Sequence, residues 1–212
     1  MNKLFKNNSE VNKPSPVKLS SHHLLAIEGM QKTEIQKLLD RADYFANLDK
    51  HADTKFLSGY VVLNVFFENS TRTRVSFELA ARRLGAEVIN ISLINSSIKK
   101  GESLLDTAST LNAMKPDLLI VRHPHSGAPL LFADYLSCSI INAGDGRHEH
   151  PTQALLDALT IKRRIGYLEG LKISICGDIS NLSLIHISEP TRPERIWVCG
   201  FWVKKKRGGG GG

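Results

Sequence analysis

The sequence STRTR, residues 70–74, lies between an apolar run at 60–67 (YVVLNVFF) and a helical pattern at 75–84 (VSFELAARRL). This order predicts a strand, a short polar turn and a helix start. The first N–H groups of such a helix lack intrahelical partners and carry partial positive charge. Hydroxyl groups donate single hydrogen bonds, and guanidinium groups donate planar pairs that match phosphate oxygens. The stretch alone fits two interpretations, a phosphate pocket or a capped helix with a solvated basic first turn.

The alternation of apolar runs and helical patterns continues through the chain. A first helix is expected from Thr33, which fits a capping box with Gln36. Helices are then expected at 75–84, 103–114, 128–136 and 151–164, and strands at 60–67, 87–92, 117–121, 139–142 and 172–176. Near-continuous apolar strands that alternate with helices are typical of buried parallel sheets. The sequence therefore predicts an α/β fold, a doubly wound parallel sheet.

Polar clusters follow four consecutive predicted strands. They occupy residues 70–74, 96–100, 122–124 and 142–153. Because ligands bind at the carboxyl ends of parallel strands, we expect these clusters to converge on one anion site. The set holds no convincing nucleophile–base pair, acidic metal cluster or P-loop, and the alternating His148 and His150 have no evident third metal ligand. The clusters are instead rich in positive and neutral hydrogen-bond donors. A site built from such donors suits transfer of an activated group whose leaving group is phosphate.

Composition excludes several classes of protein. The net charge is +7 over 212 residues, but residues 180–212 hold six Lys or Arg and two Glu, so the remaining 22 basic and 19 acidic residues give only +3. The charge therefore does not indicate nucleic-acid binding. The three cysteines have no zinc or disulfide spacing. No secretory signal or membrane-length apolar run is present. We expect a cytoplasmic protein that binds neither membrane nor nucleic acid.

Four motifs together resemble one family. They are FENSTRTRVSFE at 67–78, KKGES at 99–103 with Ser96 before it, RHP at 122–124, and HPTQALLD at 150–157. The chain resembles the aspartate/ornithine carbamoyltransferases over residues 20–179, and the KKGES loop is similar to the aspartate branch. The resemblance implies transfer of the carbamoyl group of carbamoyl phosphate to the amine of L-aspartate, giving N-carbamoyl-L-aspartate and phosphate, an early step of pyrimidine synthesis.

The resemblance also implies roles for individual residues. The carbamoyl phosphate would be bound by Ser70, Thr71, Arg72, Thr73, Arg122, His150 and Gln153, of which Arg72, Thr73, Arg122 and His150 would be catalytic. Lys100, with Ser96 from the same loop, would reach the aspartate site of a neighbouring subunit. A homotrimer follows, with regulatory or dihydroorotase-type chains as further partners. No metal or organic cofactor is expected.

The family pattern stops near residue 180. We expect an N-terminal arm at 1–20, a carbamoyl-phosphate-binding domain at 21–166, the start of an aspartate-binding domain at 167–179 and a disordered tail outside the family at 180–212. The rest of the aspartate-binding domain would be missing. Three hypotheses stay open: the catalytic chain of an aspartate carbamoyltransferase, represented by a fragment whose own activity is open, an ornithine-type enzyme, and a carbamoyl-phosphate-binding module without transferase activity.

Overall fold

The described part of the chain contains one parallel sheet of four strands. The computed structural model describes residues 17–49, 52, 54–93 and 103–173. The strand order is β2-β1-β3-β4, and every neighbouring pair is parallel. The strands are β1 (Val61–Phe66), β2 (Glu87–Ser92), β3 (Leu118–His123) and β4 (Ser139–Asp145). The chain leaves β1 toward β2 on one side and continues to β3 on the other, so the sheet has a switch point between β1 and β3.

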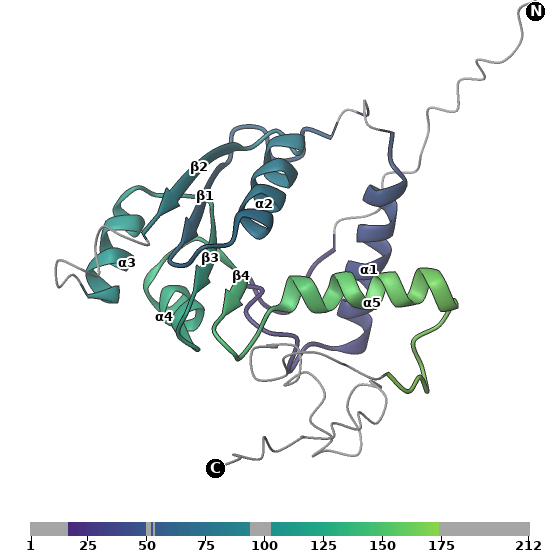
Figure 1. Cartoon of the computed structure of the whole chain (residues 1–212). Helices are drawn as coiled ribbons and strands as arrows, with labels where there is room; N and C mark the ends of the chain where they lie inside the picture. The colour runs from purple at the N-terminus through teal and green to yellow at the C-terminus, as the bar shows by residue number, and fades with distance from the viewer. Residues whose placement is uncertain (1–16, 50–51, 53, 94–102, 174–212) are drawn as a thin grey trace, which may run out of the picture.

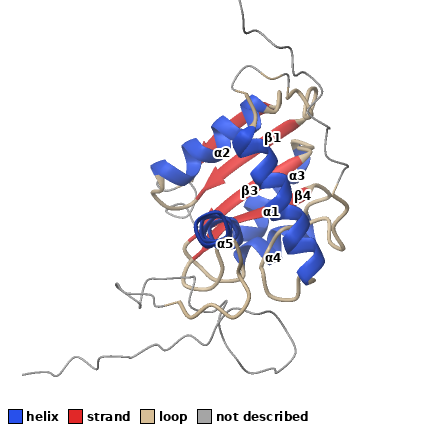
Figure 2. Cartoon of the chain, turned by 90° about the vertical axis from the view of Figure 1, so that its right-hand side faces the viewer, coloured by secondary structure: helices blue, strands red, loops and turns tan. Residues whose placement is uncertain are grey.

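Helices cover both faces of this sheet, as expected for a doubly wound fold. They are α1 (Lys32–Asn47), α2 (Thr71–Arg83), α3 (Leu104–Ala113), α4 (Ala128–Tyr135) and α5 (Pro151–Ile165). Figure 2 shows α1, α2 and α5 in front of the strands, while α3 and α4 lie on the other side in Figure 1. Ion pairs from Lys162 to Asp40 and from Arg163 to Asp43 join α5 to α1.

Two apolar clusters hold the layers together. On one face, Leu63 and Val65 of β1 and Leu119 of β3 pack with Leu111 of α3 and Phe132 of α4. On the other face, a second cluster joins the strands to α2 through Ala81. The central strands are therefore buried on both sides, which explains their continuous apolar runs.

Several boundaries differ from those expected from the sequence. Helix α2 begins at Thr71 rather than at residue 75, so the STRTR residues enter its first turn. Strand β4 extends to Asp145 rather than stopping at residue 142. The capping box of α1 is formed by Gln31 and Glu34, not by Thr33, because the Glu34 carboxylate accepts from the Gln31 N–H.

Some predictions lie wholly or partly outside the described residues. They concern Ser96 and Lys100, most of the N-terminal arm, the fifth strand beyond Ile173 and the tail at 180–212. Lys172 and Ile173 themselves are in no strand. Within the described residues, no helix is both long enough and apolar enough to cross a membrane.

Candidate functional site

The first wall of the site is the start of helix α2 at the carboxyl end of β1. Ser70 is the N-cap residue, and its side chain makes no capping hydrogen bond. The buried Asn64 of β1 donates to the carbonyl oxygen of Arg74 at 3.1 Å, which fixes the first turn of α2 against the sheet. Arg72 is exposed and has no ion-pair partner within the part of the chain that the structure describes. The hydroxyl groups and Arg72 are thus available to an anion.

The second wall is Arg122, near the end of β3. Its Nε donates to Glu68 Oε1 at 2.5 Å, and Nη1 donates to the carbonyl oxygen of Ala143 at 3.1 Å. Since Glu68 follows β1 and Ala143 belongs to β4, Arg122 bridges three strand ends across the switch point. These bonds hold a guanidinium group at the edge where ligands of such sheets bind.

A bulge in β4 makes room for this guanidinium group. The register pairs Val121 with Asn142 but His123 with Asp145, so two residues of β4, Ala143 and Gly144, face the single Arg122. Gly144 has φ +120°, and a Cβ built on it would lie 2.8 Å from Arg122 Nη1. Only glycine lets the guanidinium group lie this close to the β4 backbone.

His150 completes the cluster at the start of helix α5. Its Nε2 lies 3.3 Å from Arg122 Nη1, and because guanidinium can only donate, Nε2 is the acceptor in this arrangement. Burial, and then the positive charge of Arg122, lower the His150 pKa from 6.5 to about 4. The imidazole is therefore neutral at pH 7, beside a permanent cation.

The structure brings the predicted residues together unevenly. Arg122 and His150 are in contact, and Ser70, Thr71, Arg72 and Thr73 lie at the neighbouring strand end. Gln153 is in the first turn of α5, but its Nε2 donates to Asp157 Oδ1 at 2.9 Å. The side-chain NH₂ of Gln153 is therefore hydrogen-bonded within α5.

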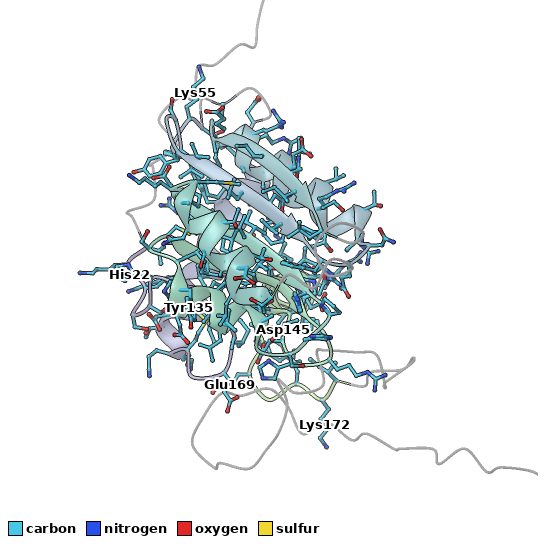
Figure 3. The ribbon with its side chains drawn as sticks, turned by 90° about the vertical axis from the view of Figure 1, so that its left-hand side faces the viewer. His22, Lys55, Tyr135, Asp145, Glu169 and Lys172 are labelled. Atoms are coloured by element: carbon cyan, nitrogen blue, oxygen red, sulfur yellow. The ribbon has the colours of Figure 1, made fainter. Side chains whose placement is uncertain are left out.

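Three residues that support this site received no role from the sequence. Glu68 binds Arg122, Gly144 makes room for it, and Asp145 accepts hydrogen bonds from two loops. Figure 3 shows Asp145 among many other side chains, in the half of the molecule away from Lys55. The glycine just past the predicted strand end, next to Asp145, was the one available signal of a bulge.

Two further groups behind the site are buried and polar. Burial raises the pKa of Glu149, and its Oε2 has no partner among the described residues. His123 accepts from the His125 N–H through Nδ1, its ring lies tilted against that of Phe67, and burial lowers its pKa. No group of three His, Cys, Asp or Glu side chains suited to a metal ion occurs within the described ranges.

Comparisons with known proteins show the family to which the chain belongs. Residues 22–163 match the model of the family "aspartate/ornithine carbamoyltransferase, carbamoyl-P binding domain". The aspartate carbamoyltransferase catalytic subunit of Jannaschia sp. is 58% identical over 164 residues, which are 76% of this chain and 52% of that protein. That of Rhodospirillum rubrum is 61% identical over 159 residues, 74% of this chain and 50% of that protein.

Solved structures give the same result. A Trypanosoma cruzi aspartate transcarbamoylase, in complex with carbamoyl aspartate and phosphate, superposes with a TM-score of 0.75 at 36% identity, covering 83% of this chain and 55% of that one. The catalytic subunit of M. jannaschii aspartate transcarbamoylase has a TM-score of 0.67 at 45% identity, covering 73% and 51%. The chain thus spans about half the length of the relatives it matches. Through the domain that forms this strand edge, the chain belongs to the aspartate/ornithine carbamoyltransferase family.

Proposed function

We propose that this chain binds carbamoyl phosphate in the active site of an aspartate carbamoyltransferase. The amine of L-aspartate would attack the carbamoyl carbon, and the bond to the phosphate oxygen would break, giving N-carbamoyl-L-aspartate and phosphate. The contact between Arg122 and a neutral His150 carries the proposal, because it sets two polarising groups beside the anion-binding start of α2. The names of the relatives favour aspartate over ornithine as the acceptor.

The proposed binding mode assigns the two ends of the substrate to different walls. The phosphate would lie at the start of α2, where Ser70, Thr71, Arg72 and Thr73 supply donors. The carbonyl oxygen would enter between Arg122 and His150 and replace their mutual contact. His150 would then donate from Nε2 in its other neutral tautomer, and Gln153 would turn from Asp157 to the carbamoyl NH₂.

The charges of these groups suit the reaction. Negative charge develops on the carbonyl oxygen as the amine attacks and on the phosphate as it leaves. Arg122 is held by Glu68 and by the Ala143 carbonyl before the substrate arrives, so little reorganisation is needed. A neutral His150 can donate a hydrogen bond without placing a second cation against Arg122.

The proposal extends to domains and assembly. Residues 21–166 would be the carbamoyl-phosphate-binding domain, 167–179 would begin the aspartate-binding domain, and 180–212 would lie outside the family pattern. A homotrimer would bring Ser96 and Lys100 into a neighbouring site, and regulatory or dihydroorotase-type chains would be further partners. The reaction would serve pyrimidine synthesis in the cytoplasm.

Calorimetric titration of the 212-residue chain with carbamoyl phosphate tests the binding step. We expect saturable binding that Arg72→Ala weakens about tenfold or more, since a charged hydrogen bond is lost. Arg82→Ala is the matched control, because Arg82 is on the same helix but pairs with Glu78. Equal affinity in the wild type and Arg72→Ala would contradict the proposed pocket.

The second candidate is a carbamoyl-phosphate-binding module without transferase activity. It is favoured by the family model that matches residues 22–163, because that model describes the carbamoyl-P binding domain. Formation of carbamoyl aspartate by the purified chain separates the two. Binding without turnover supports the module, and aspartate-dependent turnover supports a complete enzyme.

A further inference from the structure

Asp145 is the most heavily hydrogen-bonded carboxylate behind the site. Its side chain is buried, with the residue only 2% exposed. Oδ2 accepts from the Gly127 N–H at 2.8 Å and contacts His148 Nδ1 at 3.1 Å. Oδ1 accepts from the Glu149 N–H at 2.8 Å and from Asn142 Nδ2 at 3.2 Å. Backbone N–H groups thus provide the two shortest bonds to this carboxylate, which are strong because the acceptor is charged.

These bonds join two loops that leave neighbouring strands. Gly127 is the N-cap of α4 and ends the loop that follows β3, whereas Glu149 lies in the loop between β4 and α5. A backbone bond from the Gly146 N–H to the His123 carbonyl runs alongside at 2.9 Å. One buried carboxylate therefore fixes the loop after Arg122 against the loop that ends at His150.

The same carboxylate lies at the end of the β4 bulge. The bulge sets Ala143 and Gly144 opposite Arg122, and pairing resumes at His123 and Asp145. Asn142, which donates to Asp145, also accepts from the Gly144 N–H at 2.8 Å. The bulge that makes room for Arg122 is therefore supported from both of its ends.

We propose that Asp145 is a positioning residue, which holds His150 against Arg122 by tying the two loops together. The inference rests on the proposed function in that Arg122 and His150 are taken to meet the substrate. Asp145 itself lies behind the pair, with its oxygens occupied by protein donors. Its replacement acts on the site through the loops.

The sign of one NMR measurement separates positioning from a direct charge effect. The negative charge of Asp145 raises the His150 pKa, while burial and Arg122 lower it to about 4. Removing the charge alone, as in Asp145→Asn, would lower this pKa further. If the loops also loosen, His150 leaves Arg122 and gains water, and its pKa rises toward 6.5.

The experiment is an NMR titration of the histidine side chains in the full 212-residue chain. For Asp145→Asn we expect the His150 pKa to rise above its value of about 4 in the wild type. Asp117→Asn is the matched control: Asp117 accepts from the Val61 N–H at 2.8 Å at the opposite edge of the sheet, and its loss should leave His150 unchanged. A His150 pKa that stays or falls in folded Asp145→Asn would overturn the inference.

A second variant and a ligand complete the test. Asn142→Ala keeps the Asp145 charge but removes its Nδ2 donor, so it should shift His150 in the same direction even if Asp145→Asn does not fold. No shift in folded Asn142→Ala would count against the inference. We also expect carbamoyl phosphate, whose carbonyl oxygen would meet Arg122 and His150, to bind Asp145→Asn about tenfold more weakly than it binds Asp117→Asn. Because the imidazole titration needs no ligand, it tests the positioning role even if carbamoyl phosphate does not bind.

Discussion

Replacing Gly144 with alanine should displace Arg122 and weaken anion binding. The new Cβ would lie 2.8 Å from Arg122 Nη1 and 3.3 Å from Cζ, closer than real Cβ contacts allow. The guanidinium group is held at Nε by Glu68, so it must tilt and give up the bond to the Ala143 carbonyl and the contact with His150. The backbone would also be strained, because φ at residue 144 is +120°.

The magnitudes follow from these losses. Backbone strain costs about 1–3 kcal/mol, and a lost hydrogen bond to a charged group costs about 1.5–3 kcal/mol. We therefore expect Gly144→Ala to lower the free energy of unfolding by roughly 2.5–6 kcal/mol. Loss of one correctly aimed charged donor should weaken carbamoyl phosphate binding about tenfold to a hundredfold.

Urea denaturation and calorimetric titration measure the two effects separately. Gly59→Ala is the matched control, because Gly59 has φ +83° but no atom within 4 Å of a built Cβ. It should lose stability through strain and keep the affinity of the wild type. If folded Gly144→Ala binds carbamoyl phosphate as tightly as Gly59→Ala, the guanidinium group of Arg122 does not need the space at Gly144 in order to bind the ligand.

Three further predictions concern pH, charge geometry and the core. Because the His150 pKa is lowered to about 4 in the folded chain, the unfolded chain binds more protons between about pH 4 and 6.5. The free energy of unfolding should therefore decrease as the pH is lowered through this range, and urea denaturation at several pH values should show a smaller slope for His150→Gln. Arg122→Lys keeps the charge but cannot reproduce the bonds at Nε and Nη1, so carbamoyl phosphate affinity should fall about tenfold by calorimetry while Arg82→Lys retains it. Phe132→Ala should cost about 3–5 kcal/mol in urea denaturation, because Phe132 is fully buried, whereas Tyr135→Ala on the same helix removes a half-exposed ring and should cost far less.

The central strands could be predicted from the sequence because they are buried and therefore almost continuously apolar. β2 begins and ends where expected, at Glu87 and Ser92, and β1 and β3 differ by one or two residues at their ends. β4 was predicted too short because its bulge contains Gly144 and ends at Asp145, residue types that usually indicate a turn. Burial of Asp145 depends on donors from another loop, which a local pattern does not contain.

The convergence of these strand ends was predicted for a similar reason. Parallel strands place their carboxyl ends at one edge, so the contact of Arg122 with His150, and the position of residues 70–74 at the neighbouring strand end, followed from topology. The start of α2 was placed four residues late because its first turn is polar and carries no apolar periodicity. Glu68 lay within the motif at 67–78, but its bond to Arg122 could not be predicted locally. Arg122 lies 54 residues later in the chain, and the pairing of β1 with β3 brings the two together.

A crystal structure of the chain with carbamoyl phosphate would show directly whether the substrate binds between the start of α2 and the pair Arg122 and His150. We expect the phosphate at the start of α2, within hydrogen-bond distance of Ser70 and Arg72, and the carbonyl oxygen between Arg122 and His150. The contact between those two side chains would be replaced by contacts with the ligand. Carbamoyl phosphate bound elsewhere, or no ligand at this site at a saturating concentration, would contradict the proposed binding mode.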